Sequence, residues 1–242
     1  TLVHACGGAA ALAGVIVLGA RSGRFTSQGG KRAMVPFAAS SIPLVTLGTF
    51  LLWFGWFGFN GFSQLAMGTF DDVNAISKIA VNTHLAGAAG TVTGAAMTRL
   101  IGGKTDIVMM LNGALAGLVA ITAEPLTPGP ITAMVIGSIG AVIMYYGTKM
   151  LERLGLDDVV GAIPVHMFAG IFGTLVVPFT NGNTDFGTQF IGMFSVVVFS
   201  FVLSYLTFTA MKATIGLRIS KEAEKLGTDK AEVGVIAYSI RD

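Results

Sequence analysis

The sequence predicts an all-α membrane protein, a polytopic transmembrane helix bundle with about seven spans. Composition is the first reason: of the 242 residues, 53% are hydrophobic and only 12% are charged. The mean hydropathy is +0.75, far above that of soluble domains. Patterning is the second reason, because the charged residues cluster between apolar runs of roughly 20 residues, the length that a helix needs to cross about 30 Å of hydrocarbon. Lipid is therefore the expected solvent for most of this chain.

The apolar runs give the expected spans in order. They cover about 1–20, 36–60, 75–98, 106–123, 131–150, 160–179 and 188–212. Together they form a transmembrane domain over residues 1–216, followed by a tail over residues 217–242. The 33 glycines favour a tight bundle, because small residues let helix backbones approach closely in a membrane. The first span begins without an initiator Met or a signal-peptide pattern, and we therefore expect further residues upstream.

Basic residues mark one side of the predicted bundle. They occur in alternate loops and in the tail, and they are Arg21, Arg24, Lys31, Arg32, Arg99, Lys104, Lys149, Arg153, Lys212, Arg218, Lys221, Lys225, Lys230 and Arg241. The intervening loops hold Asp71, Asp72, Glu124 and Asp185, with Lys78 as the only base nearby. Under the positive-inside rule, the first span runs from outside to inside and the tail is cytoplasmic.

The first and sixth expected spans share a pattern. His4 and His166 are each followed by small residues four and seven positions later. These residues are Gly8 and Ala11 in the first span and Gly170 and Gly173 in the sixth. At helical spacing, each histidine and its two small residues lie on one face. Five crossings separate the two spans, so they run in opposite directions and form an inverted repeat, whose interface carries the substrate path in transporters.

His4 and His166 are the main candidates for chemistry. An imidazole in hydrocarbon is unfavourable unless its ring nitrogens find partners, and ionisable residues within spans mostly face a bundle interior or a cavity. We favour a functional role for both; the alternative is a pair of helix-packing histidines bonded to carbonyl groups. A metal site is disfavoured, because two histidines without a carboxylate or Cys partner in the same spans make a poor ligand set. No cofactor is expected.

Two other polar features have structural interpretations. His84 has no counterpart in the repeat, and we interpret it as a helix-contact histidine that is hydrogen-bonded to a neighbouring span. Asp157 and Asp158 precede the sixth span, where acidic residues cap a helix and interact favourably with its dipole.

The end of the second span is rich in aromatic residues and lies at the outer surface by the charge argument. An aromatic belt at the membrane interface is one interpretation. The other is a site for a small hydrated cation, with ring faces, an amide and a hydroxyl at helical spacing. The residues concerned are Trp56, Phe59, Asn60 and Ser63. Their spacing leaves both interpretations open.

Several segments, in this order, resemble the Amt/MEP/Rh ammonium transporters. They are residues 1–4, residues 47–60 (LGTFLLWFGWFGFN), residues 111–122 (LNGALAGLVAIT) and Asp157-Asp158 followed by Val165-His166. The tail resembles the Amt branch through residues 216–220 (GLRIS), Gly227, Asp229, Glu232, Gly234 and Ala237-Tyr238. The likeness covers essentially the whole chain. It implies spans five to eleven of an eleven-span fold of inverted halves, assembled as a homotrimer in the cell (inner) membrane with one pore per subunit.

The same resemblance implies roles for individual residues. His4 and His166 correspond to a twin-histidine pair, hydrogen-bonded to each other along a narrow apolar pore. Phe59 corresponds to a gating phenylalanine below the outer vestibule. The other residues that the resemblance places along the substrate path are Trp56, Ser63, Asn60 and Thr122, with Asp158 supporting the pore.

The implied function is ammonium transport rather than enzymatic catalysis or nucleic-acid binding. NH4+ would be recruited at the outer vestibule, deprotonated and conducted as NH3, because carrying the ion through a dry pore has a large desolvation penalty. Pro164 and Met167 depart from the commonest family pattern. Val233 also departs, at a position that bears on the implied binding of a nitrogen-regulatory protein to the tail. The alternatives are an ammonium-binding membrane sensor and an Rh-like channel for another small neutral solute.

Overall fold

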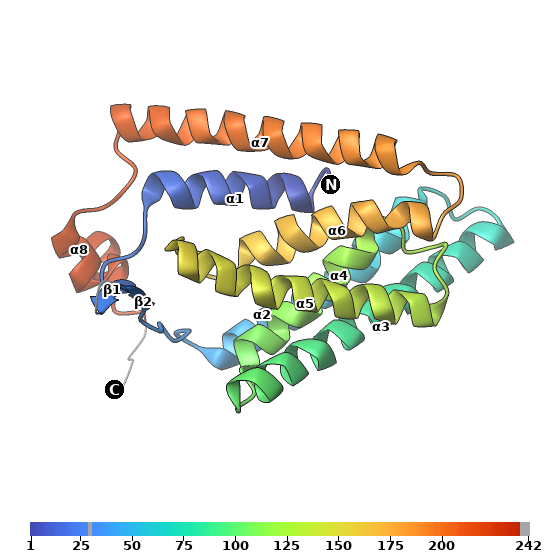
Figure 1. The fold of residues 1–242 in the computed structure, drawn as a ribbon, viewed down its shortest axis with the longest axis horizontal. Helices are drawn as coiled ribbons and strands as arrows, with labels where there is room; N and C mark the ends of the chain where they lie inside the picture. The colour runs from blue at the N-terminus through green and yellow to red at the C-terminus, as the bar shows by residue number, and fades with distance from the viewer. Residues whose placement is uncertain (29–30, 238–242) are drawn as a thin grey trace.

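Seven helical segments run back and forth along the long axis of the molecule (Figure 1). In chain order they are α1 (His4–Leu18), α2 (Ile42–Gly61), α3 (Phe70–Gly102), α4 (Ile107–Thr122), α5 (Pro130–Leu154), a composite sixth segment and α7 (Phe186–Thr214). The sixth segment joins the π-helical turn η2 (Ile163–Phe168), α6 (Ala169–Val176) and the 3-10 turn η3 (Val177–Phe179). The structure, a computed structural model, describes residues 1–28 and 31–237, so Tyr238 and Arg241 lie outside the described residues. The predicted helical fold is confirmed.

A small antiparallel hairpin in the first basic loop is an addition that the sequence patterns did not predict. Its strands are β1 (Phe25–Gln28) and β2 (Lys31–Met34), with Phe25 opposite Met34. The guanidinium of Arg32 lies 5.9 Å from the centre of the Phe25 ring and donates a hydrogen bond to the carbonyl of Leu154 at 2.6 Å. The hairpin therefore contacts the C-terminal end of α5, where a cation is favourable.

The second helix begins at Ile42, six residues after the predicted start. Ser41 caps it, because its hydroxyl accepts a hydrogen bond from the backbone N–H of Leu44 at 3.4 Å. Pro43 lies in the first turn, where its missing N–H needs no partner. The start at residue 36 was predicted from hydrophobicity alone. The capping residues Ser41 and Pro43 determine where the helix begins.

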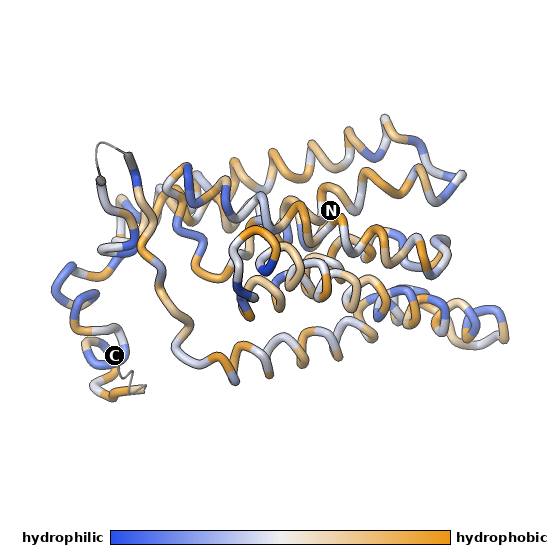
Figure 2. Tube along the Cα trace, turned by 60° about the horizontal axis from the view of Figure 1, so that its bottom comes forward, coloured by the Kyte–Doolittle hydropathy of each residue, from blue (hydrophilic) through white to orange (hydrophobic). Residues whose placement is uncertain are grey.

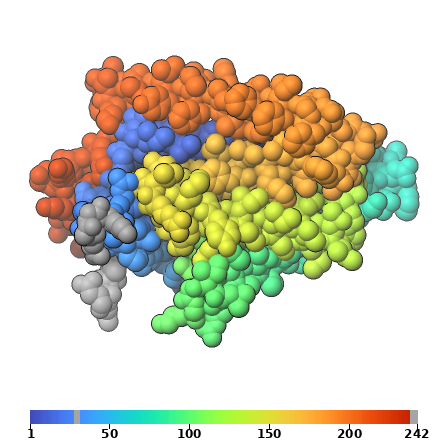
Figure 3. Space-filling model, in the orientation of Figure 1, coloured from blue at the N-terminus to red at the C-terminus, as the bar shows by residue number. Residues whose placement is uncertain are grey.

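The helices differ in length and burial. Among the described residues, three helices are long and apolar enough to cross a membrane: Ile42–Gln64, which includes the 3-10 turn η1 (Phe62–Gln64), then Pro130–Leu154 and Phe186–Thr214. Three further apolar helices are shorter, at His4–Leu18, Ile107–Thr122 and Ile163–Phe179. The shorter α4 is also the most central, with a long run of buried residues over its second half. Interior helices of this kind pack against protein along most of their length, whereas the long α7 runs along one flank of the molecule (Figure 3).

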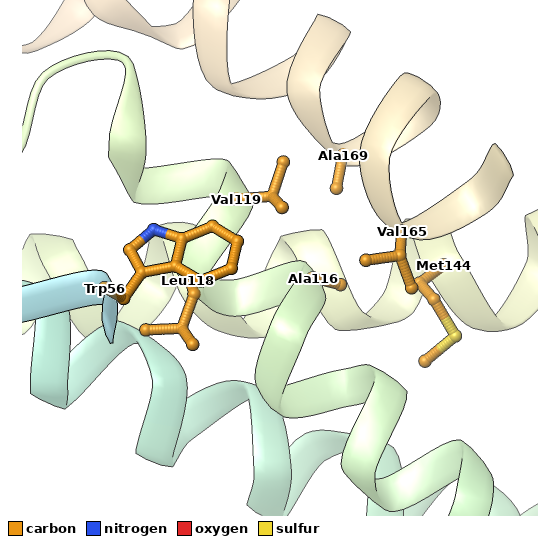
Figure 4. Close-up of a cluster of buried hydrophobic side chains, with 7 residues drawn as sticks. All are labelled: Trp56, Ala116, Leu118, Val119, Met144, Val165 and Ala169. Carbon is orange, nitrogen blue, oxygen red and sulfur yellow. The ribbon is translucent and has the colours of Figure 1, made fainter. Parts of the chain in front are cut away.

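The core is built on small residues. Gly90 of α3 lies so close to Gly113 of α4 that a Cβ at Gly113 would lie 2.5 Å from the Gly90 carbonyl oxygen. Larger side chains fill the space beside this contact, and Figure 4 shows Trp56, Leu118, Val119, Met144 and Val165 converging from four helical segments with two alanines between them. The predicted tight packing through small residues is therefore present between α3 and α4.

The loops lie at two opposite ends of the bundle. At one end, the hairpin lies beside α8 (Lys221–Leu226) and the C-terminal tail, which also contains the π-helical turn η4 (Asp229–Val233) (Figure 1). The backbone N–H of Ser22 donates to Glu224 at 2.7 Å, which ties the first basic loop to the tail. Hydrophilic residues gather toward the ends of the helices, and apolar residues lie between (Figure 2). The first basic loop thus contacts both the tail and, through Arg32, the end of α5.

Candidate functional site

The two repeat histidines meet in the interior. The Nδ1 atoms of His4 and His166 lie 3.2 Å apart, and the two rings are nearly parallel, with centroids 5.2 Å apart and an angle of 15° between their planes. α1 and the sixth segment run in opposite directions past each other (Figure 1), as the inverted repeat predicts. The predicted contact between the histidines is confirmed.

Glycines on both helices allow this crossing. A Cβ at Gly8 would lie 2.5 Å from the Cβ of Met167, and one at Gly170 would lie 3.3 Å from the Cβ of His4. The small residue four positions after each histidine therefore faces the helix that carries the other histidine. Gly173 instead faces α4, where a Cβ would lie 2.5 Å from the carbonyl oxygen of Ala120.

A π-helical turn carries His166. Asp158 holds the start of this segment, because its carboxylate accepts hydrogen bonds from the backbone N–H groups of Gly161 and Ala162, each at 3.0 Å, and of Ile163 at 2.7 Å. The capping role predicted for Asp158 is confirmed. π-Helical turns often occur at functional sites, and this one bears the most polar side chain of the segment.

Asp157 has a different role from the cap predicted for it. Its side chain is 1% exposed and forms ion pairs with Arg21 at 2.7 Å and Arg24 at 3.2 Å, so that prediction is wrong. Burial raises the pKa of the Asp157 carboxyl, but the hydrogen bonds from Arg21 and the charges of Arg21 and Arg24 outweigh it, and the net pKa lies below its ordinary value. Asp157 therefore joins the basic loop after α1 to the loop before η2.

Aromatic rings enclose one side of His4. The Trp56 ring stacks on it with centroids 5.1 Å apart, and the Phe59 ring lies 5.6 Å away in a tilted orientation. The Trp56 indole donates a hydrogen bond from Nε1 to the hydroxyl of Thr122 at 2.8 Å, which fixes the indole over the imidazole. The structure thus brings together four residues that the sequence placed along one path.

Asn60 and Ser63 lie slightly farther out. The amide nitrogen of Asn60 donates to the hydroxyl of Thr83 at 3.0 Å, so this buried side chain connects α2 to α3. The hydroxyl of Ser63 donates to the carbonyl of Phe59 at 2.7 Å. Both residues line a recess of about 250 Å³ together with Thr122, and each donates one side-chain hydrogen bond within the protein.

A larger cavity of about 350 Å³ lies against His4. Its lining combines an aromatic ring, an imidazole, hydroxyls and one carboxylate, supplied mainly by His4, Phe59, Thr122, Glu124, Thr174 and Thr184. The hydroxyls of Thr1 and Thr174 lie 2.5 Å apart on its wall. This volume is large enough for a small cation together with several waters.

His84 lies apart from this cavity. Its ring is exposed and lies 5.5 Å from the centre of the Trp53 ring and 6.2 Å from that of Phe57. Within the described part of the chain it makes these ring contacts rather than the predicted hydrogen bond to a neighbouring span. The prediction that it contacts a helix is confirmed, and the hydrogen bond is not formed.

Two features of the site were not singled out from the sequence. One is Thr83, which accepts the hydrogen bond from Asn60. In the sequence, nothing distinguishes Thr83 from other polar residues within the spans. The other is Glu124, which lines both cavities. A detectable signal existed for Glu124, because it is the sole acidic residue between two expected spans.

Comparisons with known proteins agree on one family. A model of the Ammonium Transporter Family matches residues 1–238. The ammonium transporter Amt2 of Archaeoglobus fulgidus is 42% identical over 98% of this chain and 53% of its own length. The ammonium transporter Amt2 of Methanocaldococcus jannaschii is 35% identical over 98% of this chain and 55% of its own length. The chain thus spans about half the length of these curated relatives.

Solved structures give the same result. A structure described as a sensor Amt protein superposes with a TM-score of 0.87 at 33% identity, over 95% of this chain and 58% of that protein. Mep2 of Candida albicans superposes with a TM-score of 0.80 at 27% identity, over 96% of this chain and 54% of that protein.

Proposed function

This chain belongs to the ammonium transporter family of multi-pass membrane proteins, and we propose that the whole protein carries ammonium across a membrane. NH4+ binds in the outer cavity, loses a proton there, and continues as NH3 past His4 and His166. The single observation that carries this proposal is the contact between the two imidazole rings beside a polar cavity. Trp56 and Phe59 pack against His4, which lines that cavity.

The geometry of the pair constrains its protons. Across an Nδ1···Nδ1 distance of 3.2 Å, one neutral ring must donate its proton and the other must accept with a lone pair. The donor ring then has a free lone pair at Nε2, and the acceptor ring has an N–H there. A neutral pair thus offers one donor and one acceptor to a small polar molecule, which suits NH3, itself a donor and an acceptor.

His4 supplies a group that seeks such a partner. Its Nε2 atom is buried and has no hydrogen-bond partner within the described residues. A buried polar atom without a partner is unfavourable by about 1–3 kcal/mol, and a passing NH3 supplies the missing bond. Potassium ions cannot, since they carry no hydrogen and cannot shed charge by losing a proton.

The surroundings favour deprotonation before passage. NH4+ is stabilised in the cavity by ring faces through cation–π attraction and by hydroxyl oxygens, whereas the interior beside His166 is packed with apolar side chains such as Val165 and Ala169. Taking a charge into such surroundings is far more unfavourable than taking in a neutral molecule.

We further propose the orientation and assembly of the protein. The basic end of the bundle and the tail face the cytoplasm, and the outer cavity faces away from it, in the cell (inner) membrane. The transmembrane domain covers residues 1–216 and the tail residues 217–242. The whole protein forms a homotrimer, and its tail is the binding surface for a nitrogen-regulatory protein.

The test uses the complete gene in cells that lack ammonium uptake. Growth on limiting ammonium should be restored by the wild-type gene and lost when His4 and His166 are both replaced by Ala. Membrane abundance of the protein is measured in parallel. Failure of the wild type to restore growth, or unchanged transport and selectivity in the double variant at equal abundance, contradicts the proposal.

An ammonium sensor is the second candidate. The similarity to a sensor Amt protein favours it, because the same cavity that recruits a cation for passage also serves as a receptor site. A wild-type protein that binds methylammonium but gives no uptake supports this candidate. The Rh-like channel has less support, since the tail resembles that of the Amt branch.

A further inference from the structure

Glu124 lies at the junction of the two outer cavities. It follows the last turn of α4, two residues after Thr122. It lines the cavity of about 350 Å³ that contains His4 and Phe59, and also the recess of about 250 Å³ that contains Asn60 and Ser63. Among the described residues, Glu124 therefore supplies the one carboxylate that faces both spaces.

The partners of Glu124 are all neutral. Its Oε1 atom accepts hydrogen bonds from the backbone N–H groups of Leu126 at 3.1 Å and Thr127 at 3.2 Å. Its Oε2 atom accepts from the amide nitrogen of Asn181 at 2.9 Å. A carboxylate has about four lone-pair positions, so these three bonds leave one position on Oε2.

The charge of Glu124 is not offset nearby. Within the described residues, its carboxylate forms no ion pair. Lys78, the base on this side of the bundle, lines a different recess, beside Pro128 and Pro130. A fixed negative charge in a cleft with low-dielectric walls attracts cations, because the walls concentrate its field in the solvent-filled space.

The other acidic residues at this end lie at helix starts. Asp71 and Asp72 are in the first turn of α3, where Asp72 forms a capping box with Thr69. Asp185 caps α7 by accepting from the backbone N–H of Thr188 at 2.8 Å. None of the three lines the two cavities. Glu124 thus differs from them in facing the solute path.

We propose that Glu124 is the carboxylate that recruits small ammonium-type cations to the outer cavity, with the free position of Oε2 accepting an N–H of the ion before it reaches Phe59. Three hydrogen bonds hold the carboxylate in place, so little ordering is needed when the cation arrives. This inference rests on the proposed function and assigns a specificity-determining residue to it.

The test compares two charge-removing variants of the full-length protein. Uptake of labelled methylammonium is measured for wild type, Glu124→Gln and Asp185→Asn. Glu124→Gln should raise the KM about fivefold with little change in the maximal rate, the scale of one screened charge–charge contact. Asp185→Asn, the matched control, removes a charge from the same end but not from the path, and its KM should stay within twofold of wild type.

Ionic strength separates charge attraction from a structural role. Added salt should raise the KM of wild type toward that of Glu124→Gln and leave that variant nearly unchanged, because screening acts on the charge. An unchanged KM in Glu124→Gln overturns the inference. The inference is also overturned if Glu124→Gln lowers the maximal rate and the melting temperature while the KM stays constant. That result would show that Glu124 only stabilises the loop.

A binding measurement keeps the two proposals distinguishable. Titration of the intrinsic tryptophan fluorescence of the purified protein with methylammonium reports binding in the cavity beside Trp56. If the wild type does not transport but binds, with about fivefold weaker binding in Glu124→Gln, the transport proposal fails and the role of Glu124 stands. If the variant transports and binds like wild type, transport stands and the role of Glu124 fails.

Discussion

Gly8 of α1 lies directly against Met167, the residue that follows His166. A Cβ at Gly8 would lie 2.5 Å from both the Cβ and the backbone nitrogen of Met167, closer than real Cβ atoms approach. His4 lies one helical turn before Gly8, so the contact that requires glycine also sets the distance between the two imidazole rings.

Replacing Gly8 with Ala should therefore destabilise the protein and reduce transport together. The added methyl has to displace backbone atoms, and overpacking of this kind costs about 1–3 kcal/mol. It also separates α1 from η2 and lengthens the bond between His4 and His166. Thermal unfolding of the purified protein and ammonium uptake into liposomes measure the two effects.

Gly7 is the matched control for this variant. A Cβ at Gly7 meets nothing within 4 Å, and alanine suits a helix better than glycine. Gly7→Ala should unfold at or slightly above the wild-type temperature and transport normally. Equal behaviour of the two variants would show that the crossing does not depend on close approach at Gly8.

Thr122 should matter through the hydrogen bond that it accepts from Trp56. Thr122→Val preserves shape but leaves the indole Nε1 without this acceptor, at a cost of about 1–3 kcal/mol, and loosens the ring that stacks on His4. Thr122→Ser retains the hydroxyl and should behave like wild type. Melting temperature and near-ultraviolet circular dichroism check the prediction, and a Ser variant as impaired as the Val variant would contradict it.

The order of the spans and the contact between the two histidines could be predicted from the sequence, and the reason is physical. Long apolar runs between charge clusters have few alternatives to membrane helices, and a histidine within such a run needs a partner. The matching small residues after His4 and His166 then predicted which helices meet. Gly8 and Gly170 bear this out, since each faces the helix that carries the other histidine.

Other features depend on contacts that no local pattern contains. Asp157 and Asp158 are adjacent and alike, yet one caps a helix and the other pairs with arginines more than 130 residues away. Which carboxylate takes which role depends on how the loop after α1 folds back. The position of Glu124 between two cavities likewise follows from the packing of the helices around it, not from the residues beside it in the chain.

Acid should destabilise the wild-type protein through Asp157. Its pKa is lowered in the folded state, so its stabilising contribution is present above the unfolded pKa of about 3.9 and is lost as the pH falls through the lowered folded value. The melting temperature of wild type should therefore drop steeply below about pH 4.

Asp157→Asn should remove this dependence. At pH 7 it should be less stable by about 3 kcal/mol, the low end for a broken buried pair, because Arg21 is partly exposed. Its melting temperature should change less than that of wild type between pH 5 and pH 3, a range that brackets the reference value of about 3.9. Asp71→Asn, a change at an exposed acid of α3, serves as the control and should parallel wild type. Parallel curves for Asp157→Asn and wild type would contradict the assignment.

Asp158 should control the rate of passage by positioning His166. Asp158→Ala removes the acceptor for three backbone N–H groups at the start of the segment that carries His166, so the π-helical turn loses its anchor. The maximal transport rate should fall at least tenfold, a change of about 1.4 kcal/mol, while the KM stays near wild type because the outer cavity is untouched. Asp158→Asn keeps one oxygen and should restore part of the rate. A KM that rises in step with the loss of rate, or an Asn variant no better than Ala, would instead indicate general unfolding of this region.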